Sequence, residues 1–138
     1  MIVLDTNVLS EAIKPDASER VLAWLAHQPR SNFFTTAITK AELLYGVEVM
    51  PKGQRRSALH AAITRILTQL LSDRILPFDS DAAEVYSRLA ASRKAMGRPI
   101  SEADAQIAAI AHSRGAALAT RNTPDFEHCG IKVVNPWT

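Results

Sequence analysis

Short apolar segments alternate with longer helical segments along the whole of this 138-residue chain. Turn-forming residues bound the apolar segments, which predict strands at residues 1–4, 33–37, 75–78, 117–120 and 132–134. Apolar residues at helical spacing predict helices at 7–14, 18–27, 39–49, 54–71, 81–96 and 101–114, with a helical turn at 123–127. No tight hairpin signal joins consecutive strands, which favours parallel strands connected through helices. We therefore expect a single α/β domain over residues 1–138, a three-layer α/β/α arrangement around a central parallel sheet of four or five strands.

The composition is typical of a globular protein and excludes several other classes. Apolar residues make up 47% of the chain and charged residues 22%, which disfavours intrinsic disorder. No apolar run approaches the roughly 18–20 residues that span a bilayer, so no membrane association is expected. Cys129 is the single cysteine, which rules out a disulfide framework and favours a cytoplasmic location. The net charge of +2 is compatible with a polyanionic partner but does not require one.

Acidic and amide side chains recur where the predicted strands end and the following helices begin. Asp5 ends the first strand, and Glu42 lies in the first turn of the helix after the second strand. Asp104 lies in the first turn of the helix before the fourth strand, and that strand is followed by Asn122 and Asp125. Ligand sites of open parallel sheets lie at the carboxyl ends of the strands. These five side chains could therefore converge on one edge of the sheet.

Converging carboxylates would favour a divalent cation. Like charges a few ångströms apart repel one another and raise each other's pKa, and a bound cation removes that cost. Oxygen ligands suit Mg²⁺ or Mn²⁺ better than zinc, and Mg²⁺ keeps several waters when it binds. Such a site can lower the pKa of a bound water and neutralise charge on a phosphodiester under attack. One metal or two would serve, and the sequence leaves that choice open.

Each acid also has a purely structural explanation. Asp5 can cap the helix that follows it, and Ser101 with Asp104 resembles a capping box. Glu42 and Asp125 can interact favourably with the dipole of the helices they precede or open. Helix capping explains acids near helix starts, but it does not explain why those starts should share one side of the sheet.

Four segments resemble the PIN-domain proteins, and most of all the toxins of the VapC/FitB type. In chain order they are "LDTNVLS", "TTAITKAELLYGV", "GRPISEADAQIAAIA" and "LATRNTPDF", and the resemblance runs from residue 1 to about residue 126. It implies an α/β/α fold and an endoribonuclease that depends on Mg²⁺ or Mn²⁺. Such an enzyme is the toxin of a toxin–antitoxin pair and hydrolyses RNA with a metal-activated water.

The resemblance also implies roles for individual residues. Asp5, Glu42 and Asp104 match the first three acidic positions of the family, as catalytic residues and metal ligands. The fourth position is open, because many relatives have Asp where this chain has Asn122, and Asp125 lies close by. We expect Asp125 to serve as the fourth acid. The expected supporting residues are Thr6, Thr120 and Asn122.

The partners implied by the resemblance are an RNA substrate, a cognate antitoxin that covers the acidic cleft, and a second copy of the chain in a homodimer. Operator DNA would be reached only through the antitoxin. Arg93, Lys94 and Arg98 precede Asp104 closely and could hold RNA phosphates beside the site. They could equally be solvated cations at the C-terminal end of a helix.

Two other functions remain open from the sequence. The first is a non-catalytic PIN-fold binding module that acts through an antitoxin–DNA complex, which Asn122 in place of an acid would favour. The second is a phosphoryl-transfer enzyme with Asp5 as nucleophile. That enzyme would need a second acid where this chain has Asn7. The sequence does not identify the RNA that would be cleaved.

Overall fold

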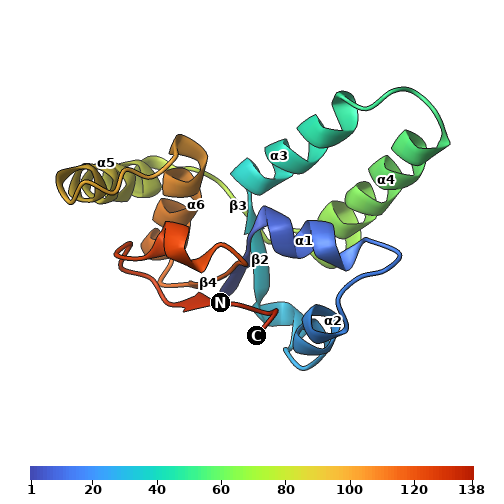
Figure 1. Ribbon diagram of the computed structural model, residues 1–138, viewed down its shortest axis with the longest axis horizontal. Coiled ribbons are helices and arrows are strands. Elements are labelled where there is room, and N and C mark those ends of the chain that lie inside the picture. The colour runs from blue at the N-terminus through green and yellow to red at the C-terminus, as the bar shows by residue number, and fades with distance from the viewer.

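The computed structural model describes residues 1–138 and contains a five-stranded parallel sheet (Figure 1). Its strands are β1 (Ile2–Leu4), β2 (Phe33–Thr36), β3 (Ile75–Leu76), β4 (Ala117–Ala119) and β5 (Val133–Val134). The strand order is β3-β2-β1-β4-β5, and each neighbouring pair is parallel. The chain therefore builds the sheet outward from β1 in one direction, through β2 and β3, and then in the other. The predicted parallel α/β sheet is confirmed.

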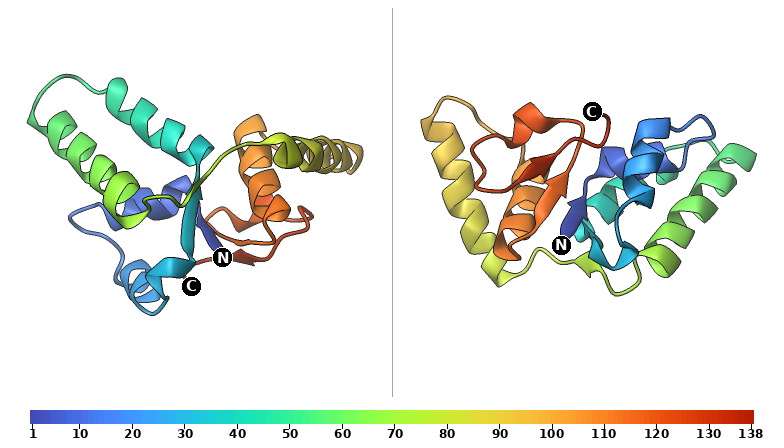
Figure 2. Two further views of the ribbon diagram at one scale, coloured as in Figure 1. Left: turned by 180° about the vertical axis from the view of Figure 1, so that it is seen from behind. Right: turned by 90° about the horizontal axis from the view of Figure 1, so that it is seen from below.

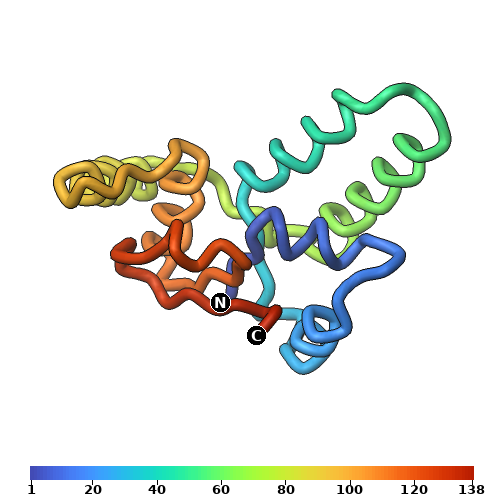
Figure 3. Tube along the Cα trace, viewed as in Figure 1, coloured from blue at the N-terminus to red at the C-terminus, as the bar shows by residue number.

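Helices cover both faces of the sheet. They are α1 (Thr6–Ala12), α2 (Glu19–Ala26), α3 (Ala37–Glu48), α4 (Gln54–Arg65), α5 (Ser80–Ala95) and α6 (Glu102–Ser113). The right-hand view of Figure 2 shows α5 and α6 on one side of the sheet and α1, α2 and α4 on the other. The trace in Figure 3 crosses from one side to the other after α4, through β3 and into α5.

Two apolar cores, one on each face, hold the layers together. Val3 and Leu118 contribute to the core under α5 and α6, whereas their neighbours Leu4 and Ala119 face the core under α1 to α4. Successive side chains of a strand point to opposite faces of the sheet. Because both faces of β1 and β4 are covered by a core, successive residues in these strands are apolar. This is the pattern of central strands in a parallel sheet, and it explains why the opening segment is so apolar.

The region predicted as one helix over 54–71 changes its winding partway. After α4 the chain continues as a π-helical segment, Ile66–Leu70, in which the Leu71 N–H donates to the Ile66 carbonyl at 2.9 Å. Leu67 and Leu71, four residues apart across this segment, both lie in the core under α1 to α4. A 3₁₀ turn at Arg30–Asn32 was also not predicted, and it leads directly into β2.

None of the helices is long and apolar enough to cross a membrane.

Shortening a core side chain of α6 should destabilise the fold. Ile107 is fully buried against the sheet, so we expect Ile107→Ala to lower the free energy of unfolding by about 2–5 kcal/mol through lost burial and the cavity left behind. Urea denaturation followed by circular dichroism measures this loss. Leu22→Ala on α2 is the control, because Leu22 is 44% exposed and its truncation should change stability by only about 0.5 kcal/mol. Equal effects of the two substitutions would contradict the assignment of Ile107 to the core.

Candidate active site

A polar pocket of about 380 Å³ lies at the carboxyl edge of the sheet. Its lining includes five residues that the sequence singled out, namely Asp5, Thr6, Glu42, Asp104 and Asn122. The position of the pocket follows from the strand order. The chain adds β2 and β3 on one side of β1 and β4 and β5 on the other, and ligand sites of open parallel sheets lie beyond the carboxyl ends of the strands where the order reverses in this way. Of the five side chains expected to converge on this edge, Asp5, Glu42, Asp104 and Asn122 line the pocket, and Asp125 does not.

Asp5 caps a helix and also belongs to the pocket. It is the N-cap of α1, and its Oδ1 accepts a hydrogen bond from the Thr6 N–H at 2.8 Å. Its Oδ2 accepts from Thr120 Oγ1 at 2.7 Å and from Asn7 Nδ2 at 3.2 Å. With only 4% of its surface exposed, the carboxylate is buried and held from three sides. The structural and the functional explanation of Asp5 are thus both satisfied by the same geometry.

Thr120 and Asn7 connect the ends of the two central strands. Thr120 is fully buried directly after β4, and its hydroxyl accepts from Asn7 Nδ2 at 3.2 Å and from the Asn122 N–H at 3.1 Å. Asn7 in turn accepts from the Arg121 N–H at 3.1 Å. The family resemblance implied a supporting role for Thr120, whereas Asn7 was not expected to contribute to the site. The spacing in "DTN" could have indicated this role, because it places Asn7 in the first turn of the helix that Asp5 caps.

Glu42 lies in the second turn of α3, and the prediction that it lies in the first turn is wrong. The helix starts at Ala37 because Thr36 caps it, with Thr36 Oγ1 accepting from the Thr39 N–H at 3.0 Å. Glu42 is exposed, yet its Oε1 accepts from Thr6 Oγ1 at 2.7 Å. The Thr6 hydroxyl also lies 3.1 Å from Thr39 Oγ1. Thr6 therefore orients the second acid toward the end of β1, consistent with its expected supporting role.

Asp104 lies in the first turn of α6, as predicted. Ser101 is the N-cap, and its Oγ accepts from the Asp104 N–H at 3.2 Å. The Asp104 side chain is half-buried and faces the charges of Asp5 and Asp125. Capping fixes the backbone of this turn and leaves the carboxylate directed at the pocket.

The surroundings of Asp5 and Asp104 disfavour the ionised form of both carboxyl groups. Burial raises the pKa of Asp5, and the charge of Glu42 raises it further, against the opposing hydrogen bonds from Thr120, Thr6 and Asn7. Burial also raises the pKa of Asp104, and the charges of Asp5 and then Asp125 add to the effect. These carboxyl groups are partly desolvated and close to one another, which is the situation that a bound cation relieves.

The donor set suits a hard cation that keeps part of its water shell. Every predicted ligand in the pocket offers oxygen, and the lining contains neither histidine nor cysteine. As the side chains lie, no three of the chain's His, Cys, Asp and Glu residues are placed to hold one ion together. Mg²⁺ commonly takes one or two carboxylates and completes its shell with water, so Asp5 and Asp104 fit such an ion. The arrangement does not resemble the closed shell of a structural zinc site.

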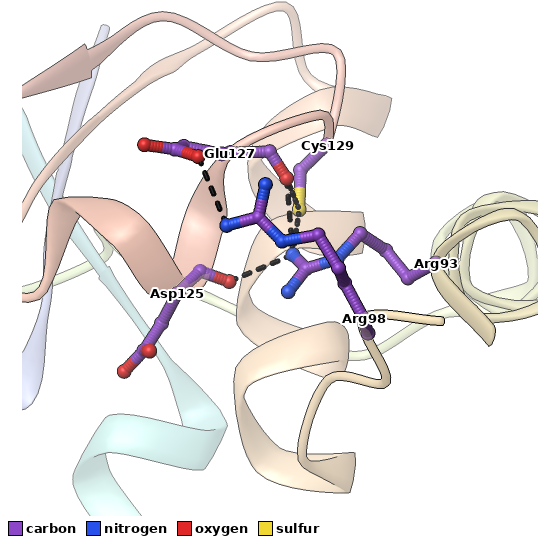
Figure 4. A network of polar contacts seen from close by, with 5 residues as sticks. All are labelled: Arg93, Arg98, Asp125, Glu127 and Cys129. Carbon is purple, nitrogen blue, oxygen red and sulfur yellow. Dashed lines mark hydrogen bonds and ion pairs between the residues drawn. The ribbon is translucent and has the colours of Figure 1, made fainter. Parts of the chain in front are cut away.

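The expected role of Arg93 in holding RNA is wrong, because this side chain is used inside the protein. Arg93 is only 4% exposed. Its Nε donates to the Arg98 carbonyl at 2.8 Å, and its Nη1 donates to the carbonyls of Asp125 at 2.8 Å and Glu127 at 3.0 Å (Figure 4). Nη1 also lies 3.4 Å from the sulfur of Cys129. Arg93 therefore ties the end of α5 to the segment that carries Asp125.

The other proposed RNA contacts and Asp125 lie outside the pocket lining. Arg98 pairs with Glu127 at 3.1 Å on the surface, and Lys94 is exposed. Asp125 is exposed too, and Figure 4 shows its carboxylate directed away from Arg93. Asn122, the other candidate for the fourth position, does line the pocket. The structure thus brings Asn122 into the acidic site and leaves Asp125 at its margin.

Comparison with known proteins places this arrangement in a family. The PIN domain matches residues 2–131. A protein named VapC ribonuclease Y4jK, from Sinorhizobium fredii, is 43% identical over 99% of this chain and 98% of its own length. A protein named Toxin FitB, from Neisseria gonorrhoeae, is 39% identical over 99% of both chains. In a solved structure described as FitAB bound to an IR36 DNA fragment, one chain is 38% identical. It superimposes with a TM-score of 0.94 over 100% of this chain and 96% of that one. The chain belongs to the PIN-domain family.

Proposed function

We propose that this protein is an endoribonuclease dependent on Mg²⁺ or Mn²⁺ and the toxin of a toxin–antitoxin pair. The observation that carries the proposal is the buried Asp5 carboxylate, held at the sheet edge in one pocket with Glu42 and Asp104. The names of the relatives support the reaction class, since they include a ribonuclease and a toxin at about this chain's full length.

The proposed metal would be held by Asp5 and Asp104, with Glu42 completing the acidic wall. A bound divalent ion would neutralise phosphate charge and lower the pKa of an attacking water. The chain's own residues position these groups. Thr120, Asn7 and the Thr6 N–H fix the Asp5 oxygens, and the Thr6 hydroxyl fixes Glu42.

Water is the proposed nucleophile, because the pocket offers no activated side chain. No histidine or cysteine lines it, and both oxygens of Asp5 already accept hydrogen bonds. That geometry suits a fixed ligand rather than a carboxylate attacking phosphorus. It disfavours the phosphoryl-transfer reading with Asp5 as nucleophile.

For the fourth position, we propose that Asn122 faces the substrate side of the site, because it lines the pocket and its N–H is bonded to Thr120. Asp125, the residue expected from the sequence, would act from the margin through its charge on Asp104.

The proposed partners are an antitoxin, and operator DNA through that antitoxin. The support is that FitB is named a toxin and that its FitAB complex has been solved on a DNA fragment. A homodimer and a cytoplasmic location stay predictions.

A non-catalytic binding module is the second candidate, favoured by Asn122 at the position where the family resemblance implies an acid. It predicts full antitoxin binding by Asp5→Asn and no RNA cleavage by the wild type.

Asp5→Asn should abolish RNA cleavage. Loss of the buried charge removes a proposed metal ligand, and we expect the rate to fall at least about 100-fold. Antitoxin-free protein would be incubated with total cellular RNA and Mn²⁺, beside an EDTA control, and the fragments resolved on a gel. Asp81→Asn is the matched control, since Asp81 is exposed on α5 outside the pocket. Undiminished cleavage by folded Asp5→Asn would overturn the proposal, and no cleavage by the wild type would favour the binding module.

Asp104→Asn should stabilise the metal-free protein at neutral pH. A carboxyl whose folded pKa is raised costs stability when ionised, and this cost vanishes as the pH falls below the unfolded value of about 3.8. In EDTA, the melting temperature of Asp104→Asn should therefore exceed that of the wild type at pH 7, and the gap should shrink toward pH 4. Glu102→Gln removes a charge from the same helical turn outside the pocket and should show no such pH-dependent gap. A gap that widens on acidification would contradict the assignment.

A further inference from the structure

We propose that Arg121, in cation–π contact with Trp137 at the rim of the acidic pocket, binds a backbone phosphate of a single-stranded nucleic acid. This inference rests on the proposed function, since it names the residue that would hold the substrate strand beside the acids. The pocket is strongly acidic. Its lining carries Asp5, Glu11, Glu42 and Asp104, so a polyanion needs a local cation to approach it.

Only two cationic side chains line the pocket, and one of them is already paired. Lys14 lies 3.4 Å from Glu11 and forms an ion pair with it. Arg121 is exposed and takes part in none of the chain's ion pairs. The cations expected from the sequence lie elsewhere, since Arg93 is buried and Arg98 pairs with Glu127. Arg121 is therefore the one unpaired positive charge in the lining of the pocket.

The Arg121 guanidinium lies over the Trp137 ring and remains available to an anion. Its Cζ lies 5.0 Å from the centroid of the Trp137 ring, and both residues line the pocket. A cation–π contact leaves the positive charge of the guanidinium intact. The only hydrogen bond that Arg121 donates within the protein comes from its backbone N–H, so the guanidinium N–H groups are free to donate to a ligand. Two guanidinium N–H groups can donate parallel hydrogen bonds to two oxygens of a phosphate.

Both members of the pair are anchored to the frame of the site. The Arg121 N–H donates to Asn7 Oδ1, and Arg121 directly follows Thr120, which holds Asp5. The backbone N–H of Trp137 donates to Asn135 Oδ1 at 2.9 Å, and the side chain packs against the core under α1 to α4. Asn7 and Thr120, which hold the Asp5 carboxylate, therefore also fix the backbone of Arg121 beside the acids. Trp137 is a positioning residue, which restricts where the guanidinium can lie.

The test measures binding without cleavage. The full chain in EDTA would be titrated against a fluorescently labelled single-stranded oligoribonucleotide, and anisotropy followed at several salt concentrations. We expect Arg121→Gln to weaken binding about 10-fold and to reduce the slope of log K against log salt by about one, as for one lost phosphate contact. Arg88→Gln is the matched control, because Arg88 is an exposed, unpaired arginine on α5 outside the pocket, and it should bind within about 2-fold of the wild type.

Two further variants separate charge from positioning. Arg121→Lys keeps the charge, so it should keep the salt slope while losing part of the affinity with the bidentate fork. Trp137→Leu should weaken binding and also leave the salt slope unchanged, because the cation remains but is no longer held. In Trp24→Phe, Trp137 is the only tryptophan, and its fluorescence should change on RNA binding.

The outcomes distinguish this inference from the proposed function. Arg121→Gln should weaken binding of DNA of the same sequence by the same factor, since phosphate is the contact; an effect on one strand type alone would overturn that assignment. Wild-type affinity and salt slope in Arg121→Gln would overturn the inference even if the protein cleaves RNA, as would absence of binding by the wild type. Binding that depends on Arg121 in a protein that cleaves no RNA would uphold the inference and reject the nuclease.

Discussion

The hydrogen bond from Thr120 Oγ1 to Asp5 Oδ2 joins the carboxyl ends of the neighbouring strands β1 and β4. At this point the chain has built the sheet outward from β1 on both sides. The Asp5 N–H reinforces this junction by donating to the Ala119 carbonyl at 3.0 Å. Asp5 also begins α1, because its other oxygen caps that helix. A buried carboxylate without partners would be costly, and three donors lower that cost without removing it. One side chain thus ends a strand, starts a helix and forms the innermost wall of the pocket.

Charges are arranged in layers around this carboxylate. The acids of the pocket lie at the sheet edge, where burial and mutual repulsion raise the pKa of Asp5 and Asp104. Arg93 lies buried behind them, bonded to backbone carbonyls, and its positive charge lowers the pKa of Asp104 to a lesser extent. Arg121 stands at the rim with its charge unpaired. A divalent cation is the proposed answer to the repulsion that remains, and the rim arginine is the proposed contact for the strand that carries the phosphate.

The sequence was sufficient for features that depend on local patterns. Strand and helix alternation predicted the parallel sheet, and the acids at the strand ends predicted the edge where Asp5, Glu42 and Asp104 meet. The sequence predicted that the helix after β2 starts at residue 39, because the residues around Thr36 favour a strand. Thr36 instead caps the helix, which therefore starts at Ala37, so Glu42 lies in its second turn. The burial of Arg93 was missed because its partners are backbone carbonyls, which carry no residue signature. The contact of Arg121 with Trp137 joins residues from separate ends of the C-terminal segment, and only the fold brings them together.

The proposed activity depends on a divalent cation bound in the acidic pocket by Asp5 and Asp104. The most direct test is a titration of the metal-free protein with Mn²⁺, followed by electron paramagnetic resonance of the free ion. Asp5→Asn, Asp104→Asn and the surface control Asp81→Asn would be titrated alongside. We predict saturable binding in the wild type and in Asp81→Asn, and at least about a 10-fold loss of affinity in each pocket variant. Equal Mn²⁺ binding by all four proteins, each shown to be folded, would contradict the account.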